Sequence, residues 1–404
     1  MIFDELVQRG LVKQTTNTEK IRDLLNNQKV TFYIGFDPTA NSLHVGHLLQ
    51  LVTARRLVRA GHRAILLIGD ATAAIGDPTG KSEMRKMLSE REIGSNALDI
   101  EDQLKKLVPG AFVITNGTWF KHSTNMSFLE ALREFGPHFS VNNMLRADSV
   151  KSRMENGLSF LEFSYMLLQA IDFFKLTDFL NINCQLQIGG DDQWSNILAG
   201  IDLVHKKKGQ EVFGLTLPLL TNSAGQKMGK TERGTVWLDA NKTSPFEFFQ
   251  FWRNIPDDKV QECTNFFTDE FPNSLIESSF DINHHKKKLA FEVTKLVHGE
   301  EAAAQALKQA EALFRDQDAS VMEATPIADS VHVLDLMMRC GFARSRTDAR
   351  NLINGRGVSI NNEVLTDPTI IVTKEKFGNE LVVRKGKKHF CRLLIEDKCQ
   401  DPNS

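Results

Sequence analysis

The spacing of hydrophobic residues changes twice between residues 31 and 68, and each change predicts a different element. Alternate side chains over 31–36 are apolar, which predicts a strand. From 48 to 58 the apolar residues recur at the helical period, and Gly61 ends that run. The continuous apolar run at 64–68 is typical of a strand buried in a parallel sheet. The order strand, helix, strand predicts a βαβ unit.

The junction between this strand and this helix carries the first candidate chemistry. Asp-Pro-Thr at 37–39 should end the strand, because proline has no amide proton for a sheet ladder. Asn41 and Ser42 are the expected N-caps of a helix that begins with Leu-His-Val-Gly-His at 43–47. A helix N-terminus attracts phosphate through its unpaired amide protons and its dipole.

The two histidines of this segment, His44 and His47, have more than one interpretation. Their spacing could ligate a metal, but a zinc site needs further ligands, and no Cys or His cluster lies near them in sequence. One surface histidine and one packed histidine would be the simplest reading of an isolated pair. Here the pair follows Tyr-Ile-Gly-Phe-Asp-Pro-Thr at 33–39, and this context favours a functional role over the simplest reading.

A second informative stretch is the strongly apolar segment 160–174, which predicts a helix. Three of its few polar residues, Tyr165, Gln169 and Asp172, fall on one narrow face at about 100° per residue. A carboxylate on so apolar a helix must be hydrogen-bonded or meet an opposite charge. The residues alone leave two alternatives, a structural network across a helix pair or a polar ligand site.

Three loops complete the candidate sites. The loop after the 64–68 strand ends in Gly-Lys-Ser at 80–82, but Ile75 stands where a P-loop needs its first glycine, so a P-loop NTPase is discounted. In that loop Asp77 either shapes a turn before proline or faces a substrate ammonium. The strand 185–190 ends in Gly-Gly followed by two aspartates, which can indicate acid–base chemistry or a divalent metal. The glycine- and lysine-containing segment 224–231 is a weak phosphate signal by itself.

Composition narrows the class of protein. The chain has 404 residues, which favours two or three domains, with 41% hydrophobic and 25% charged residues as in a soluble globular protein. A net charge of −2 argues against uniform coating of nucleic acid but leaves room for a local basic patch. Five cysteines without Cys-x-x-Cys spacing favour a reducing compartment. Without a secretory segment or an apolar run of about 18 residues, we expect a cytoplasmic protein with no membrane segment.

Together these motifs resemble the class I aminoacyl-tRNA synthetases of the tyrosyl, bacterial type, and the resemblance covers essentially the whole chain. His-Val-Gly-His at 44–47 occupies the first class signature, with Val45 in place of isoleucine. Lys-Met-Gly-Lys-Thr at 227–231 resembles the second signature, with Gly229 and Thr231 in place of serines. The resemblance implies three groups of site residues. The tyrosine-binding group comprises Tyr33, Asp77, Tyr165, Gln169, Asp172, Gln187 and Gln193. The ATP-binding group comprises Gly35, Asp37, Thr39, His44, Gly46, His47, Gly190, Asp192, Lys227, Met228 and Lys230. The catalytic group comprises His44, His47, Lys81, Lys227, Lys230 and Thr231, and no metal ligands are implied.

In this family Tyr33 and Asp172 would bind the substrate phenol. Tyr165 and Gln169, together with Asp77, would hold its ammonium group. Phenylalanine would leave the phenol partners unpaired, a means of discrimination that tyrosine-specific members of the family illustrate. The sequence departs from the usual pattern at Ile171, where tyrosine is common. By the helical period Ile171 points away from the pocket.

The resemblance also implies an α/β fold with three parts. A Rossmann-like parallel-sheet catalytic domain spans 1–223 and contains a helical connective insertion at about 120–160. The signature loop and a helical domain span 224–325, and a small α+β RNA-binding domain of the ribosomal S-four type spans 332–404. The insertion has apolar positions that could form a dimer interface or a core, namely Phe128, Leu129, Leu132, Phe135 and Phe139.

Two further stretches agree with this division. The aromatic residues between 246 and 252 are interpreted as core, and 318–331 is interpreted as a linker. Residues 332–396 contain twelve lysines and arginines against seven acidic residues, which suits contacts with structured RNA.

The expected activity is tyrosine–tRNA ligation by a homodimer. Its partners would be L-tyrosine, ATP and tRNA(Tyr), with ATP as a substrate and Mg²⁺ accompanying it. The alternative is a non-catalytic RNA-binding paralogue, which would be expected to lack His44, His47, Lys227 or Lys230, and all four are present. A tryptophan specificity is disfavoured because Tyr33 and Asp172 are both present.

Overall fold

The computed structural model describes most of the chain, and contacts divide the chain into two compact units. The described residues are 1–79, 87–121, 126–154, 157–178, 182–223, 225, 227–231, 234–269, 281–312, 324–386 and 389–396. The first unit comprises Met1–Gly229, Val236–Ser244 and Phe251–His298, and the second comprises Lys230–Thr235, Pro245–Gln250 and Gly299–Ser404.

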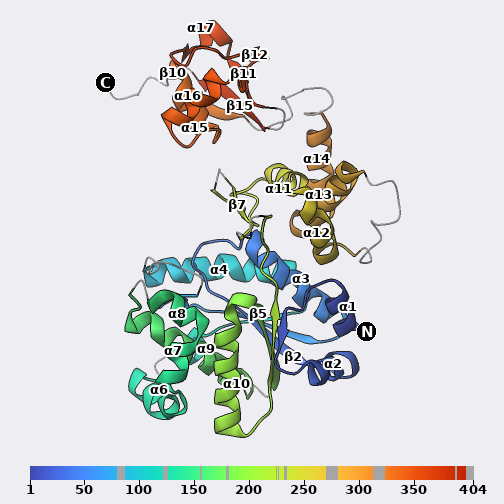
Figure 1. Cartoon of the computed structure of the whole chain (residues 1–404), viewed down its shortest axis with the longest axis vertical. Coiled ribbons are helices and arrows are strands. Elements are labelled where there is room, and N and C mark those ends of the chain that lie inside the picture. Colours follow the sequence, from blue (N-terminus) through green and yellow to red (C-terminus); the bar gives the residue numbers. More distant parts are fainter. Residues whose placement is uncertain are drawn as a thin grey trace. The chain divides into compact units, whose positions relative to one another are not determined.

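A six-stranded sheet with the order β1-β6-β5-β2-β3-β4 forms the centre of the first unit (Figure 1). Its strands are β1 (Gln14–Thr15), β2 (Thr31–Phe36), β3 (Arg63–Ile68), β4 (Phe112–Thr115), β5 (Cys184–Gly190) and β6 (Phe213–Leu217). All neighbours are parallel except β1, which pairs antiparallel with β6. From β2 the chain continues to β3 and β4 on one side, whereas β5 and β6 lie on the other. The carboxyl ends of β2 and β5 therefore flank the switch point where open α/β sheets bind ligands.

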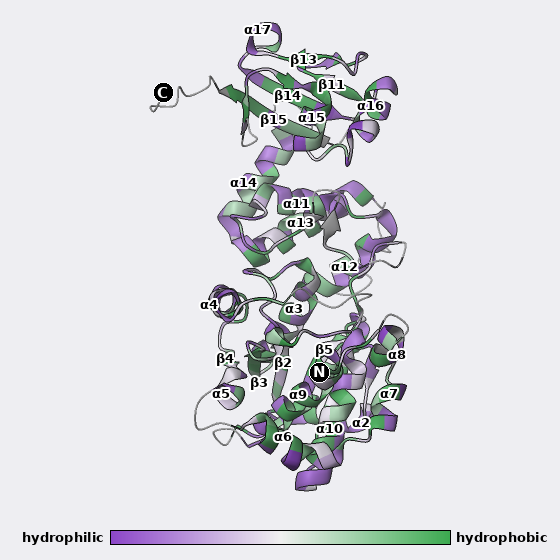
Figure 2. Ribbon diagram, turned by 90° about the vertical axis from the view of Figure 1, so that its left-hand side faces the viewer, coloured by the Kyte–Doolittle hydropathy of each residue, from purple (hydrophilic) through white to green (hydrophobic). Residues whose placement is uncertain are grey.

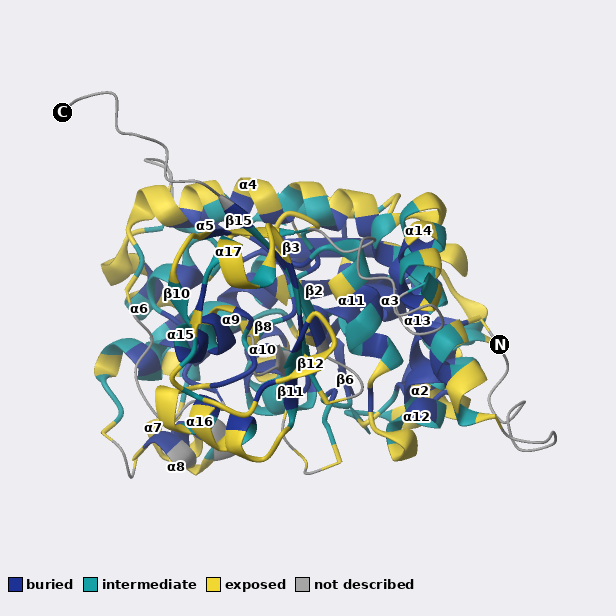
Figure 3. Cartoon of the chain, turned by 90° about the horizontal axis from the view of Figure 1, so that it is seen from above, coloured by how far each residue is buried: buried dark blue, intermediate teal, exposed yellow. Residues whose placement is uncertain are grey.

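Helices cover both faces of this sheet, which explains its nearly continuous burial. The helices that pack on it are α3 (Val45–Arg59), α4 (Glu90–Leu107), α9 (Phe160–Leu176) and α10 (Trp194–Lys208). Tyr33, Ile65 and Leu67 share a core cluster with Phe173 of α9 and Val204 of α10, so alternate strand residues face this helix pair. In Figure 3 the strands β2 and β3 are buried, while α4 exposes one face to solvent.

The start of α3 differs from the sequence expectation. The expected N-caps, Asn41 and Ser42, are wrong, because the helix begins at Val45 and its N-cap is His44. The carbonyl of Leu43 accepts a hydrogen bond from the amide of Leu238, and the amide of Leu43 donates one to the side chain of Gln103. These long-range bonds keep residue 43 out of the helix.

The connective segment forms small helices beside α9: α5 (Gly117–Phe120), α6 (Phe128–Phe135), α7 (Val141–Arg146) and α8 (Asp148–Met154). Its apolar residues divide into two sets. Phe135 is fully buried with Ile171 and Leu203, so Ile171 does point away from the tyrosine-group residues of α9. Phe128 and Leu129 are instead 62% and 75% exposed.

A buried ion pair joins α8 to the first turn of α9. The Arg153 and Glu162 side chains are 2% and 3% exposed, and Nη2 lies 2.8 Å from Oε1. Glu162 also accepts hydrogen bonds from the amide and hydroxyl of Ser159, the N-cap of α9. The pair thereby fixes the connective helices against the helix that carries Tyr165 and Asp172.

The first unit contains further helices near the N-terminus and between residues 251 and 298. They include α1 (Ile2–Gln8), α2 (Thr18–Asn27), α12 (Val260–Phe267) and α13 (Ile282–His298). Two buried arginines, Arg9 and Arg56, both donate to the carbonyl of Thr268 at the end of α12. In α11 (Pro245–Arg253), Phe248, Phe249 and Trp252 are fully buried, which confirms the expected core role of the aromatic stretch.

The second unit contains a five-stranded sheet with the order β12-β11-β14-β15-β9. The strands are β9 (Thr325–Ala328), β11 (Val358–Ile360), β12 (Glu363–Val364), β14 (Glu380–Lys385) and β15 (His389–Glu396). Its other elements are β7 (Lys230–Thr231), β8 (Gly234–Thr235), α14 (Glu300–Glu311), β10 (Val331–His332), α15 (Val333–Arg339), α16 (Arg346–Asn354), β13 (Ile371–Val372) and α17 (Lys374–Phe377). Figure 2 shows how hydrophobic the central strands are, and the expected α+β class of this region is confirmed.

The expected linker over 318–331 is wrong where β9 forms at 325–328. Pro326 obscured this strand in the sequence, yet β9 lies at the edge of its sheet, where proline is tolerated. Among the helices of the described residues, none is both long and apolar enough to cross a membrane.

Replacing Arg153 by methionine should lower the free energy of unfolding by about 3–5 kcal/mol, because Glu162 would remain buried without its counter-charge. Urea unfolding followed by tryptophan fluorescence measures the loss. The matched control is Lys105→Met, because the pair of Lys105 with Glu101 on α4 is 57% and 31% exposed. We expect the control to lose less than about 1 kcal/mol. Equal losses in both variants would contradict the structural role of the buried pair.

Candidate active site

Two stacked histidines close the N-terminus of α3. Nδ1 of His44 accepts from the amide of Gly46 at 3.0 Å, and Nδ1 of His47 accepts from the amide of His44 at 3.2 Å. The ring centroids are 4.0 Å apart. Because both Nδ1 atoms are acceptors, a neutral ring carries its proton on Nε2. A Cβ at Gly46 would lie 2.7 Å from the His44 ring, so this geometry requires glycine.

The second signature lies against this helix start. The amide of Val236 donates to the carbonyl of Gly229, and the amide of Val45 donates to the carbonyl of Val236. Gly229 has a φ of +97°, which favours glycine, and a Cβ there would lie 3.5 Å from Val45. Within the first unit the fold therefore brings Met228 and Gly229 next to the His-Val-Gly-His segment.

The two aspartates after β5 point to different partners. Asp192 lies 2.6 Å from Nζ of Lys227 in the second signature, and a Cβ at Gly190 would lie 2.9 Å from its Oδ1. Asp191 accepts instead from the side chains of Gln14 and Thr216, at 2.7 and 2.9 Å. The carboxylates therefore do not act as a pair: Asp192 faces the signature lysine, and Asp191 ties the turn to β1 and β6.

Tyr33 and Asp172 form a buried polar group on the α9 side of the sheet. Oδ1 of Asp172 accepts from Nε1 of Trp119 at 2.9 Å, and Oδ2 accepts from Nδ2 of Asn116 at 3.1 Å. Burial raises the pKa of Asp172 well above its usual value, and the negative charge of Asp37 adds to this effect. Burial, followed by the charge of Asp172, likewise raises the pKa of Tyr33. Within the described residues the Tyr33 hydroxyl has no hydrogen-bond partner, so the group can still accept or donate to a ligand.

A second polar group lies at the other end of the Asp172 face of α9. The hydroxyl of Tyr165 donates to Oδ2 of Asp37 at 2.8 Å. Asp77, which is 8% exposed, accepts from Nε2 of Gln193 at 2.8 Å and from the amide of Thr79 at 2.9 Å. Burial raises the pKa of Tyr165, and the nearby charges of Asp37 and Asp77 raise it further. Two carboxylates around one hydroxyl make this end suitable for a cation.

The remaining candidates have different settings. Gln187 is 3% exposed and pairs in register with Tyr33, and its Oε1 has no partner in the described part of the chain. Gly35 is exposed within an otherwise buried strand, and a Cβ there would face open space. Gln169 is half-buried on α9, and Thr39 is exposed. Lys81 lies outside the described residues, as do the side chains of Lys230 and Thr231.

Comparisons with known proteins agree with this arrangement. A family model described as "tRNA synthetases class I (W and Y)" matches residues 25–315. A second, described as "Tyrosine--tRNA ligase SYY-like C-terminal domain", matches residues 311–393. The chain is 47% identical over 410 aligned positions to the tyrosine–tRNA ligase of Acetivibrio thermocellus, covering 98% of this chain and 99% of that protein. This chain belongs to the tyrosine–tRNA ligase family.

Solved structures support the membership of the class I tyrosine–tRNA ligase family. The chain is similar to a C-terminally truncated mitochondrial tyrosyl-tRNA synthetase from Aspergillus nidulans, with a TM-score of 0.68 and 30% identity over 78% of this chain and 94% of that one. It shares its fold with a tyrosyl-tRNA synthetase from Archaeoglobus fulgidus, at a TM-score of 0.55 and 18% identity, over 76% of this chain and 100% of that one. The predicted family, fold class and ligase class are therefore confirmed.

Three residues of the candidate site were missed in the sequence. Asn116 and Trp119 hold Asp172, and Thr72 donates to Oδ1 of Asp37 at 2.8 Å. The sequence held a signal for two of them, because Thr72 and Asn116 follow the predicted strands that became β3 and β4, whose carboxyl ends lie at the same edge of the sheet. Asp37 was expected at ATP, whereas its carboxylate contacts Tyr165, a member of the predicted tyrosine group.

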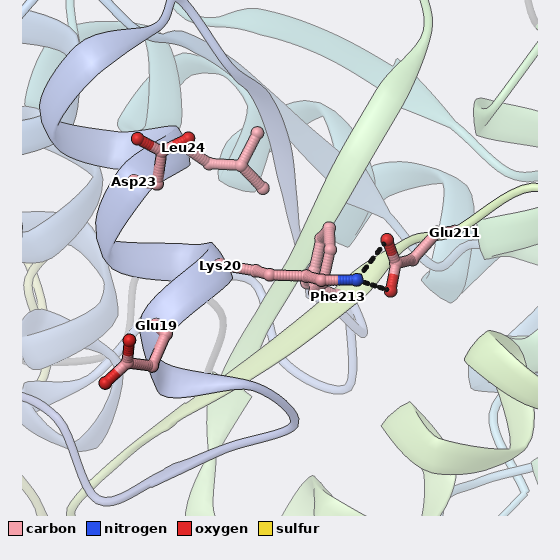
Figure 4. A pocket seen from close by; sticks show the side chains of 6 residues that line it. All are labelled: Glu19, Lys20, Asp23, Leu24, Glu211 and Phe213. Atoms are coloured by element: carbon pink, nitrogen blue, oxygen red, sulfur yellow. Dashed lines mark hydrogen bonds and ion pairs between the residues drawn. The ribbon is translucent and has the colours of Figure 1, made fainter.

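The alternative metal interpretation of the histidines gains no support from the described residues, which contain no group of three or more His, Cys, Asp or Glu side chains that could hold a metal. A pocket lies elsewhere, between α2 and the amino end of β6, and is lined by Glu19, Lys20, Asp23, Leu24, Glu211 and Phe213 (Figure 4). Its lysine already bonds both carboxylate oxygens of Glu211, at 2.6 and 2.8 Å. The pocket is at the amino end of β6, whereas the candidate active site is at the carboxyl ends of the strands.

The raised pKa of Asp172 predicts a pH-dependent difference between the wild type and the Asp172→Asn variant. A raised folded-state pKa means that folding favours the protonated acid, so its stabilisation is present below the unfolded value of about 4 and is lost as pH rises through the folded value. Asparagine does not ionise. The free energy of unfolding of the variant should therefore increase relative to wild type as pH rises from about 4. Urea unfolding between pH 4 and 8 measures this, and a difference independent of pH would contradict it.

Proposed function

We propose that this chain activates L-tyrosine with ATP, giving tyrosyl-adenylate and pyrophosphate, and then transfers tyrosine to the 3′ end of tRNA(Tyr). One observation carries the proposal. The buried side chains of Tyr33 and Asp172, which we propose bind the phenol, lie on the α9 side of the sheet whose carboxyl end carries Asp77 and the histidine-capped N-terminus of α3.

Recognition of tyrosine would use both ends of this arrangement. The substrate phenol would take the place beside Tyr33 and Asp172, and its ammonium would lie between Asp77 and Tyr165, with Asp37 as a further acceptor. Gln169 would also hold the ammonium, Gln187 would line the same slot, and Gln193 would face the substrate carboxylate. Phenylalanine would leave buried polar atoms unpaired, which costs about 1–3 kcal/mol per group.

ATP would bind at the start of α3 and the turn after β5. In the proposed arrangement the Nε2 protons of His44 and His47, the helix dipole and Lys227 favour the negative phosphates. Asp192, now paired with Lys227, would accept from a ribose hydroxyl, while Gly190 and Gly46 allow close approach of the backbone. The remaining members of the proposed ATP group are Gly35, Thr39, Met228 and Lys230.

The first step requires alignment and charge neutralisation. A tyrosine carboxylate is ionised at neutral pH, so it attacks the α-phosphorus without a general base. The new bond joins a carboxylate oxygen to phosphorus, and the bond to the pyrophosphate oxygen breaks. We assign stabilisation of the developing charge to His44, His47, Lys81, Lys227, Lys230 and Thr231. Mg²⁺ would enter on the phosphates of ATP, because this ion keeps water ligands and favours phosphate oxygens.

In the second step a hydroxyl of the terminal adenosine of tRNA attacks the tyrosyl carbonyl carbon, and AMP leaves. The basic α+β part at 332–404 would bind tRNA, as its excess of positive residues suggests. The proposed domain division remains 1–223, 224–325 and 332–404, as the motifs imply.

A homodimer is the proposed assembly. The connective insertion and the start of α9 expose large apolar side chains: Phe128 at 62%, Leu129 at 75%, Val141 at 56% and Phe160 at 68%. Exposed apolar residues gathered on one segment are typical of protein–protein interfaces.

Lys227→Ala should lower kcat for tyrosine-dependent ATP–pyrophosphate exchange about 10²–10³-fold with little change in the KM for tyrosine, because it removes charge stabilisation near the phosphates. Lys230→Ala should behave in the same way. The control, Lys20→Ala, removes an exposed cation at the opposite edge of the sheet and should leave exchange unchanged. Unaltered exchange in both signature variants would remove the lysines from the mechanism, and no exchange in the wild type would favour the non-catalytic alternative.

Placing a charge on the exposed insertion should separate the proposed dimer. The double variant Phe128→Asp/Leu129→Asp is expected to sediment as a monomer at concentrations where wild type is a dimer. Leu98→Asp is the control, because Leu98 is 65% exposed on α4, outside the insertion. A wild-type monomer, or a double variant that stays dimeric, would overturn this assignment.

A further inference from the structure

The two polar ends of the candidate tyrosine site are joined by one continuous chain of hydrogen bonds. The Tyr165 hydroxyl donates to Oδ2 of Asp37 at 2.8 Å, and the Thr72 hydroxyl donates to Oδ1 of the same carboxylate at 2.8 Å. Nδ2 of Asn116 lies 3.1 Å from the Thr72 oxygen and 3.1 Å from Oδ2 of Asp172. Thr72 is thus the link between the cation end and the phenol end.

The orientation of the Asn116 amide is determined by its surroundings. Its Oδ1 accepts from the amide of Ala71 at 2.9 Å, so its NH₂ group must face Thr72 and Asp172. Each of the two amide protons therefore has an acceptor. The Thr72 oxygen accepts one of them, which leaves its own proton for Asp37 or for the carbonyl of Gly69 at 3.2 Å. The shorter bond to an ionised carboxylate is the stronger of the two.

Water is excluded from the bonds around Asn116. Asn116 is fully buried, and Thr72 and Asp172 are 2% and 3% exposed. In such surroundings the bonds of a chain polarise one another, so a change in charge at one end alters the strength of bonds at the other. A Cβ at Gly69 would lie 2.1 Å from the Asp37 oxygen and 2.3 Å from the Thr72 oxygen, so the backbone is shaped around this contact.

We propose that Thr72 is a positioning residue that couples recognition of the substrate's ammonium group to recognition of its phenol. The inference rests on the proposed function. A bound ammonium pairs with the Asp37 carboxylate and keeps it an acceptor, so the Thr72 hydroxyl donates to Asp37 and its oxygen is left to accept from Asn116. Asn116 in turn holds Asp172 in the orientation that a phenol needs. Binding coupling is reciprocal, so the phenol also strengthens ammonium binding.

Four ligands measure this coupling: L-tyrosine, L-phenylalanine, 3-(4-hydroxyphenyl)propanoate and 3-phenylpropanoate. They differ only in the phenol hydroxyl and the amine. Their dissociation constants come from calorimetric titration, and for the weak ligands from competition with tyrosine in ATP–pyrophosphate exchange. In the wild type, removal of the phenol hydroxyl should weaken binding more when the amine is present, by about fivefold or more.

Thr72→Val keeps the shape of the side chain and removes the hydroxyl, so the effects of hydroxyl and amine should become independent in this variant. Thr72→Ser keeps the hydroxyl and should restore the coupling. Thr53→Val is the matched control, because Thr53 is a fully buried threonine whose hydroxyl donates to the carbonyl of Leu49 within α3. It should retain the wild-type coupling.

Each outcome has a defined meaning. Coupling that persists in Thr72→Val would show that the carboxylates communicate through space, and it would overturn the role of Thr72. Equal weakening of all four ligands would show a merely structural residue and would also overturn it. If Thr72→Val does not fold, Thr72→Ala provides the same comparison, with thermal unfolding as the check. A wild type without tyrosine-dependent exchange would refute the proposed function itself, whereas an active wild type without coupling would refute only this inference.

Discussion

The burial of the Asp172 carboxylate is the constraint on which the site depends. An aspartate inside an apolar helix is unstable unless donors replace the lost water, and here Asn116 and Trp119 supply one donor to each oxygen. Those donors come from the end of β4 and from α5, so the position of α9 against the sheet is determined by polar contacts as well as by apolar packing. The buried pair of Arg153 and Glu162 secures the first turn of the same helix.

Some of the site was predictable because its signals are local. The period-two pattern of 31–36 and the apolar run of 64–68 each reflect burial within a parallel sheet, and the structure has β2 and β3 there. The shared face of Tyr165 and Asp172 follows from helix geometry alone, and both side chains are buried. What these side chains contact required family resemblance, because periodicity says which way a residue points and not what it meets.

The parts that sequence reasoning missed depend on long-range contacts. Thr72 and Asn116 are 44 positions apart, and only the parallel pairing of β3 with β4 brings them together. The true N-cap of α3 was missed for a similar reason, since hydrogen bonds from distant segments keep residue 43 out of the helix. The linker was misplaced because Pro326 reads as a break, whereas an edge strand accepts it. Local preference was overruled by the surrounding fold in each case.

The contact between Asp37 and Thr72 also depends on the absence of a side chain at Gly69. The oxygens of Asp37 and Thr72 already occupy the space that a side chain at position 69 would fill. Even a single added methyl group would push apart the carboxylate and the hydroxyl, and so would disturb both ends of the tyrosine slot at once. In the proposed site, the selection of tyrosine for attachment to tRNA therefore depends in part on the absence of a Cβ atom at position 69.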